Sequence, residues 1–286
     1  KKEVRTMSSL RNVCVLLVCF FVGGVINSAS AEEDISISTG ATLILQGSTG
    51  VDENEVDGTI SSDIEVEKPF GDYGLAFIHL EAGNGTGLDE VIATFGGVNG
   101  DAGDTESSAE VTEAWYEHYL NRLTVTFGKI DVAAYMDDNE LANDECTQFL
   151  AGPFINSIAV EFPDDNGLGI RLLVAASEVF ELNLGVAEDD ADWRKVEDNL
   201  FGFIQANFKR EGGNYRAYAW MDTSDHTEFL DETATDKKNA GFGVSFDQVF
   251  SDIVSAFLRA GLQDKKVSEI EYAWSVGAQF AGNRWN

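Results

Sequence analysis

Long stretches of the chain alternate between apolar and polar side chains. In residues 35–46 the odd positions carry Ile35 and Ile37, whereas the even positions carry mostly polar or small residues such as Ser36 and Ser38. The same period of two recurs in residues 60–66, 180–186, 240–247 and 270–280. A period of two is typical of β-strands whose two faces meet different surroundings. The pattern therefore predicts an all-β protein.

Strand length separates two kinds of all-β protein. The strands of soluble sandwiches average about 5–6 residues, whereas several of these repeats run to ten or twelve. Outer-membrane barrels use segments of about ten residues that alternate lipid-facing and lumen-facing side chains. The lengths favour an antiparallel transmembrane β-barrel of the porin type over a sandwich.

The connections between the repeats fall into two classes, which porin-type barrels place at opposite ends. Short turns are expected at 68–72, 120–121, 163–167 and 211–213, and long acidic connections at 83–109, 130–155, 188–198 and 223–238. Short and long alternate if residues 168–187 form one strand, which gives about twelve strands. A turn at Ser177 and Glu178 would instead give about thirteen and break the alternation.

Aromatic residues gather near the ends of the expected strands, where barrels carry interfacial girdles, although sandwich cores use aromatics as well. These residues are Tyr73, Trp115, Tyr116, Tyr119, Tyr215, Trp220, Phe280 and Trp285.

The N-terminal residues 1–31 resemble a secretory signal peptide. Lysines and arginines precede an apolar run at 13–25, and the small residues Ala29 and Ala31 fit a cleavage site. Without this segment the chain keeps 15 basic and 49 acidic residues, a net charge of −34, which argues against nucleic acid as a partner. Cys146 then remains as a lone thiol, so no internal disulfide is expected.

The connection at about 130–155 is expected to be a functional loop, because ordered loops of more than about 12–15 residues are uncommon otherwise. It combines aromatic residues with acids and amides, and in a porin such a loop folds inward and narrows the channel. The polar members are Asp137, Asp138, Asn139, Glu140, Asn143, Asp144 and Glu145. Four of them, Asp137, Asp138, Asp144 and Glu145, are also candidate Ca²⁺ ligands, although no EF-hand spacing is present and solvated acidic loops are common.

Several short motifs resemble, in order, the carbohydrate-selective porin family, the OprB-like porins of outer membranes. They lie at 127–131, 137–145, 147–149, 166–171 and 213–216. The resemblance implies a sixteen-stranded outer-membrane barrel through which sugars diffuse inward. Since twelve or thirteen strands are expected here, residues 32–286 are expected to form a barrel domain that lacks its C-terminal strands. A complete twelve-stranded barrel is the alternative.

Three arginines have the parity of lumen-facing positions: Arg171, Arg216 and Arg259. A lipid-facing arginine would cost about 2–4 kcal/mol at mid-depth, so this parity has a structural explanation as well as a functional one. Asn214, Tyr218 and Trp220 share a strand face with Arg216 and are candidate sugar contacts, although tyrosine and tryptophan also belong to girdles.

Catalysis is not expected, because the three histidines are scattered and no nucleophile or Cys/His metal motif is present. The predicted function is passive, sugar-selective diffusion through a monomeric or homotrimeric porin that contacts outer-membrane lipid. A general cation-preferring diffusion porin and a secreted acidic β-rich surface protein are the alternatives.

Overall fold

The computed structural model describes residues 18–21, 24–27, 35–49, 55–89, 91–92, 94–103, 107–191, 195–196, 198–231 and 233–282. Most of the expected signal peptide lies outside these residues, as do Trp285 and the C-terminal end, so cleavage and truncation stay predictions. No helix among the described residues is long and apolar enough to span a membrane.

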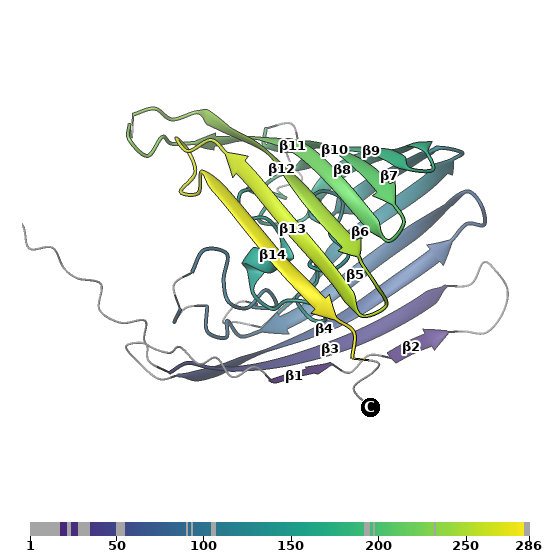
Figure 1. Cartoon of the computed structure of the whole chain (residues 1–286), viewed down its shortest axis with the longest axis horizontal. Helices are drawn as coiled ribbons and strands as arrows, with labels where there is room; N and C mark the ends of the chain where they lie inside the picture. The colour runs from purple at the N-terminus through teal and green to yellow at the C-terminus, as the bar shows by residue number, and fades with distance from the viewer. Residues whose placement is uncertain are drawn as a thin grey trace, which may run out of the picture.

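The described structure is almost entirely antiparallel β-sheet (Figure 1). The strands are β1 (Val18–Phe21), β2 (Gly24–Asn27), β3 (Ser36–Gly47), β4 (Val56–Pro69), β5 (Gly74–Asn84), β6 (Ser108–Leu120), β7 (Leu123–Ile130), β8 (Gly167–Ser177), β9 (Phe180–Glu188), β10 (Leu200–Arg210), β11 (Gly213–His226), β12 (Lys237–Val249), β13 (Val254–Gln263) and β14 (Tyr272–Phe280). One short helix, α1 (Gly152–Ile155), lies between β7 and β8.

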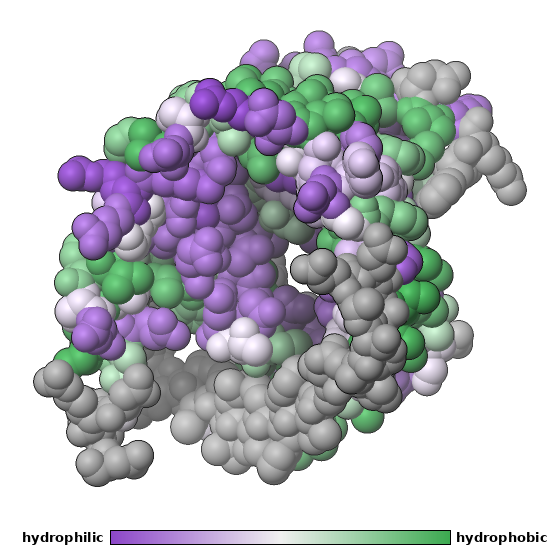
Figure 2. Space-filling view, turned by 90° about the vertical axis from the view of Figure 1, so that its right-hand side faces the viewer, coloured by the Kyte–Doolittle hydropathy of each residue, from purple (hydrophilic) through white to green (hydrophobic). Residues whose placement is uncertain are grey.

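The twelve strands from β3 to β14 form the wall, each paired with its neighbours in sequence. The sheet curls around a hollow whose visible lining is hydrophilic, while apolar residues lie on the outside (Figure 2). The short strands β1 and β2 both pair with β3. The predicted all-β barrel architecture is therefore confirmed.

Side-chain burial follows the predicted alternation. On β3, Leu43 and Leu45 are exposed on the outer face, while Ile44 and Gln46 between and beside them are buried inside. On β14 the outward residues Tyr272 and Trp274 are 70% and 69% exposed. A row of exposed apolar side chains on the outer face is what a lipid-facing surface requires.

Of the two alternatives for residues 168–187, the structure shows two strands joined by a turn, not one extended strand. Residues in this segment form the hairpin β8–β9, in which Leu172 pairs with Leu184 and Ser177 with Phe180. The hairpin does not break the alternation of connections, because the predicted short turn at 163–167 is the end of a long loop. Twelve strands run from β3 to β14, the lower of the two expected counts, although that count was expected only with a single strand over 168–187.

The other short turns lie where they were expected, at one end of the barrel. Asn121 (φ 57°) and Gly212 (φ 71°) have left-handed backbone conformations in the turns β6–β7 and β10–β11. Asparagine and glycine tolerate this region best, which explains why these sequences form tight turns.

Two of the long connections fold inward. We call residues 131–166, between β7 and β8, the constriction loop, and residues 85–107 the β5–β6 loop. The constriction loop is longer than the 130–155 expected, since 156–166 continue it instead of starting a strand. A buried hydrophobic cluster lies between this loop and the wall at β10 and β11.

Candidate functional site

Apolar residues at the start of the constriction loop attach it to the inner wall. Val132 and Met136 are buried against Phe201 and Trp220 of β10 and β11. The rings of Phe201 and Trp220 stack with their centroids 5.6 Å apart. The loop thus covers the wall with a small hydrophobic core, and its direction across the barrel is fixed by burial of these side chains.

Arg259 of β13 holds the middle of the constriction loop. Its guanidinium donates hydrogen bonds to the carbonyl oxygen of Asp137 at 3.2 and 2.7 Å, to that of Phe154 at 3.0 Å and to Asn143 Oδ1 at 3.0 Å. Arg259 Nε also lies 3.1 Å from Asp137 Oδ2. Both side chains are buried, so the pair has the extra hydrogen bonds that a desolvated ion pair needs.

Asp137 itself adopts a left-handed conformation, with φ 61°. Its carboxylate accepts a hydrogen bond from the Ser157 backbone at 2.7 Å, and its own backbone donates to Gln205 Oε1 at 3.0 Å. Burial raises the pKa of Asp137, an effect that Arg259 opposes. These contacts hold an unfavourable backbone conformation in place at the centre of the loop.

Arg216 of β11 forms a second attachment. Its Nε lies 2.9 Å from Asp138 Oδ2, and its Nη1 donates to the buried carboxylate of Asp247 on β12. Glu140 is 3.8 Å from the same guanidinium but is 70% exposed, so it projects into the lumen. The acid at the loop surface is therefore Glu140, while Asp138 is held against the wall.

Arg171 of β8 forms the third attachment. Its guanidinium carbon lies 4.5 Å from the centre of the Tyr135 ring in the loop. It is held in place by Glu117 at 3.1 Å and by Asn183 at 2.8 Å. Asn183 also donates to the Tyr135 carbonyl oxygen at 2.6 Å, so wall and loop are joined by side chain and backbone together.

The three arginines therefore face inward, as their parity predicted, but each contacts the constriction loop. Tyr218 and Trp220 also face inward and are only 4% and 3% exposed. The loop covers their rings, so in this arrangement they support the loop and present no open face to a solute. Their predicted role in sugar contact stays untested.

Asn214 differs from the other predicted pore-lining residues. It borders a cavity of about 420 Å³ near the short turns, together with Glu140, Lys209 and Asp247. Asn214 donates to Asp247 Oδ1 at 3.0 Å and accepts from Asn207 at 3.1 Å. This cavity lies beside the exposed acid of the constriction loop.

The remaining polar residues of the loop have separate contacts. Asn139 donates to Ser245 Oγ at 3.1 Å, while Asp144 accepts hydrogen bonds from the backbone of Cys146 and Thr147. The four candidate Ca²⁺ ligands thus have different neighbours. Of these four, only Glu145 belongs to a group of three potential metal ligands in the described residues.

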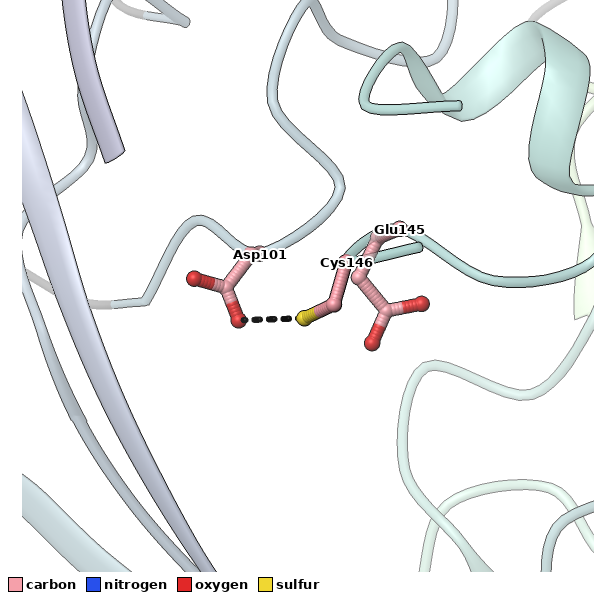
Figure 3. A group of neighbouring side chains, drawn as sticks. All are labelled: Asp101, Glu145 and Cys146. Atoms are coloured by element: carbon pink, nitrogen blue, oxygen red, sulfur yellow. Dashed lines mark hydrogen bonds between the residues drawn. The ribbon is translucent and has the colours of Figure 1, made fainter. Parts of the chain in front are cut away.

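That group joins the two inward loops (Figure 3). Cys146 Sγ lies 3.9 Å from Asp101 Oδ1 in the β5–β6 loop, and Glu145 is adjacent. Asp101 also accepts a hydrogen bond from Ser61 on β4 at 2.7 Å. Burial raises the pKa of the Cys146 thiol to about 12, so it stays protonated and unreactive at neutral pH.

The same burial acts on the neighbouring carboxyl groups. Desolvation, with the nearby acids Asp144, Asp101 and Glu81, raises the pKa of Glu145 to about 7. Desolvation likewise raises the pKa of Asp101. The junction of the two loops therefore gains negative charge as the pH rises through neutrality.

The β5–β6 loop covers the inner face of β3 and β4 at the end of the barrel where the long connections lie. Gln46 donates to the Val98 carbonyl oxygen at 3.1 Å and accepts from the Leu88 backbone at 3.1 Å. The sequence predicts a long acidic connection here but not its inward course. Apolar residues within this connection, such as the fully buried Leu88, are the signal that could have suggested it.

Closer to the short turns, the wall at β4, β5 and β6 is less covered. Glu65 and Glu67 of β4 are exposed on the inner face. Across from them, Phe77 of β5 and Trp115 of β6 stack with ring centroids 4.9 Å apart, and Trp115 donates to Glu113 at 2.9 Å. Trp115 is one of the aromatic residues that the sequence places near strand ends, where girdles occur, but its strand parity places it on the inner face.

Comparison with known proteins agrees with this architecture. The model of the family described as "Carbohydrate-selective porin, OprB family" matches residues 58–286. The high-pH structure of Pseudomonas putida OprB superposes with a TM-score of 0.74 at 14% identity, covering 87% of this chain and 71% of that one. A triple mutant of Rh. blastica porin gives 0.46 at 15% identity, covering 87% and 80%.

A comparison with curated protein sequences finds no relative. The family match spans the constriction loop, its three arginine attachments and every strand from β5 onward. The family match, together with the all-β porin architecture and the inward loop, shows that the chain belongs to the carbohydrate-selective porin family, OprB, and is an outer-membrane porin.

Proposed function

We propose that this porin lets small sugars diffuse through it without chemical change. Their path lies between the constriction loop and the less covered inner wall at β4, β5 and β6. The observation that carries the proposal is the stacked pair of Phe77 and Trp115 on the inner face, bordered by acids. Both rings are half-buried, and Trp115 also packs against the edge of the buried cluster beneath the constriction loop. Sugar rings have apolar faces that pack on aromatic rings, and a few polar groups then fix their orientation.

Polar groups for that purpose lie next to the rings. Glu113 is hydrogen-bonded to Trp115 Nε1, and Glu67 pairs directly with Phe77 across the β4–β5 ladder. Carboxylates accept hydrogen bonds from sugar hydroxyls. An aromatic platform with carboxylates beside it supports weak, reversible binding, which a diffusion channel needs because the solute must leave again.

Passage of sugars is tested in planar bilayers. Mono- and oligosaccharides are titrated against the ion current of the wild type, where we expect a saturable block. In Trp115→Ala the concentration for half-block should rise by about tenfold or more, since loss of stacking on one ring costs about 1–3 kcal/mol in comparable base–aromatic stacks. Trp274→Ala, on the outer face, is the matched control.

The result also shows whether the stacked rings of Phe77 and Trp115 bind the sugar or whether the sugar binds elsewhere. A block that weakens in Trp115→Ala but not in Trp274→Ala supports the platform. A block unchanged in Trp115→Ala refutes it, and no block by any sugar would leave a general diffusion pore.

A general cation-preferring pore is the second candidate, because Glu65, Glu67 and Glu140 are all exposed toward the lumen. Clefts lined by one sign of charge concentrate the opposite ion. Neutral sugars are not steered by this field, so sugar passage and cation preference are compatible. The reversal potential under a salt gradient measures the preference.

The proposal also includes how the protein reaches the outer membrane: it is exported through a signal peptide that is cleaved after Ala31. It rests on the basic and apolar N-terminal segment. N-terminal sequencing of the protein purified from outer membranes would begin at Glu32 if the proposal holds. Contact with lipid follows from the apolar outer face, and size analysis in detergent distinguishes a monomer from a homotrimer.

A further inference from the structure

Three potential metal ligands converge where the constriction loop passes the end of β11. They are Glu161 of the loop and Asp222 and His226 of the strand. His226 Nε2 lies 2.9 Å from Glu161 Oε2 and 3.4 Å from Asp222 Oδ2. The three ligand atoms all lie within 4.8 Å of one another. None of the three takes part in the attachments made by Arg171, Arg216 or Arg259.

The hydrogen bonding of His226 fixes which ring nitrogen faces the two carboxylates. Nδ1 lies 2.8 Å from the Ser224 carbonyl oxygen and 3.3 Å from that of Lys237. Carbonyl oxygens only accept hydrogen bonds, so Nδ1 carries a hydrogen. In the neutral ring Nε2 therefore presents a lone pair to two carboxylate oxygens, and this repulsion is relieved either by a metal ion between them or by a proton on Nε2.

The carboxylates are also oriented by neighbours. Asn239 Nδ2 donates to Glu161 Oε2 at 2.5 Å, and the Ser224 backbone donates to Asp222 Oδ1 at 2.7 Å. Asn239 and Asp222 are both buried in the wall. Metal-binding histidines generally donate the N–H of their other ring nitrogen to a carbonyl or carboxylate oxygen, and metal-binding carboxylates are generally hydrogen-bonded as well. The three residues here have these contacts.

We propose that Glu161, Asp222 and His226 bind a divalent transition-metal ion of the zinc type, which ties the constriction loop to β11. Zinc bonds of about 2.0 Å in tetrahedral geometry place the ligand atoms roughly 3.3 Å apart, close to the 2.9 and 3.4 Å observed. Two carboxylates balance the charge of the ion, and imidazole favours zinc over calcium or magnesium.

The site is reachable from solvent on the side of Glu161. Glu161 is 43% exposed, whereas Asp222 is 3% exposed. The ion would therefore enter from the loop side and complete its coordination with water. The rival occupant is a second proton on His226, which would make the group an ion-paired imidazolium. This proposal does not depend on which solute the porin passes.

Zinc titration of the full chain folded in detergent distinguishes the two occupants. We expect one Zn²⁺ per chain, measured by competition with a chromogenic chelator, and no displacement by excess Mg²⁺. His226→Ala and Glu161→Gln should each weaken the affinity by about tenfold or more, because even outer-shell changes cost 10–100-fold. Heat-modifiable mobility on gels establishes that each variant is folded.

His79→Gln is the matched control, since His79 also lies beside one carboxylate, Asp63, at 3.2 Å but outside any group of three ligands identified in the described residues. It should leave zinc affinity unchanged. Glu161→Gln alters only an exposed loop residue and keeps the test valid if the strand variant fails to fold. Absence of stoichiometric zinc binding, or equal binding by wild type and Glu161→Gln, overturns the proposal in favour of the imidazolium.

Zinc should also stabilise the attachment of the loop. Saturating Zn²⁺ is expected to raise the unfolding temperature of the wild type and of His79→Gln, and to leave that of Glu161→Gln unchanged. A rise of the same size in Glu161→Gln would show that zinc stabilises the barrel elsewhere, and would contradict the proposed tie.

Discussion

The inner wall has two regions built from the same kind of strand but used differently. Across β8–β13 the inward residues Arg171, Arg216, Trp220 and Arg259 lie beneath the constriction loop. Across β4–β6, near the short turns, Glu65 and Glu67 stay exposed on the inner face. Inward parity therefore does not make a residue part of the channel surface, because a loop can cover it.

Charge explains why the loop lies on one region and not on the other. The constriction loop carries Asp137 and Asp138, which pair with arginines of β13 and β11. The open wall carries acids of its own, so the loop would meet like charge there. Where loop and wall are in contact the charged side chains are buried, so such repulsion would be stronger than in water, and attraction to the arginines favours the observed side.

The largest expected effect follows from removing the central attachment. Arg259→Ala leaves Asp137 buried without its partner, and breaking a buried pair in this way costs about 3–5 kcal/mol. We expect a lower unfolding temperature and a larger, noisier single-channel conductance. Arg259→Lys should recover only part of this, because one ammonium cannot replace the bonds to Asp137, Phe154 and Asn143. Arg122→Ala, in the β6–β7 turn, is the control.

A smaller loss is expected from Trp220→Ala. The cavity left beneath the loop should destabilise the barrel by about 3 kcal/mol, since the loop can settle partly into it. Conductance should rise while saturable sugar block persists. If sugar block instead disappears at unchanged conductance, Trp220 touches the sugar directly, and the division between covered and open walls is wrong at this residue.

The charges of the open wall should set ion preference. Neutralising Glu65 and Glu67 together should lower cation over anion permeability by roughly 1.5- to 2-fold per charge, from Coulomb energies at about 8 Å with screening. Asp138→Asn, at an acid already paired with Arg216, should change the ratio less. Reversal potentials under a salt gradient provide the measurement, and equal effects of both changes would contradict the comparison.

The smallest effect is the pH dependence at the loop junction. Because the pKa of Glu145 is raised to about 7, its carboxyl group ionises between about pH 6 and 8 and adds one negative charge. Cation preference should therefore rise over this range, by roughly 1.5-fold for one screened charge. Glu145→Gln should remove the step, and a step that persists would assign it to another group.

The same group links stability to pH. The folded state holds this proton more tightly than the unfolded chain, where an ordinary glutamate has a pKa of 4.5. Its contribution to stability is therefore fully present below about pH 4.5 and is lost as the pH rises to about 7. The unfolding temperature of the wild type should therefore fall, relative to that of Glu145→Gln, as the pH rises over this range. Thermal unfolding of both proteins measures this fall.

The sequence determined the fold because strand parity is a local property. The period of two assigned Leu43 and Leu45 to the outer face and Arg171, Arg216 and Arg259 to the inner face, and the structure agrees at each of them. The turn at Asn121 was likewise predictable, because its left-handed conformation depends on adjacent residues alone.

What lies inside the barrel was decided by contacts between residues far apart in sequence. Arg259 meets Asp137 across 122 positions, and Cys146 meets Asp101 across 45. No local pattern reports such pairs, so the sequence could not show that the constriction loop covers Trp220 or that Trp115 stacks on Phe77. Burial of Val132 and Met136 and pairing of the loop acids decide which inward face is covered, because charge and apolar area are balanced over the whole lumen.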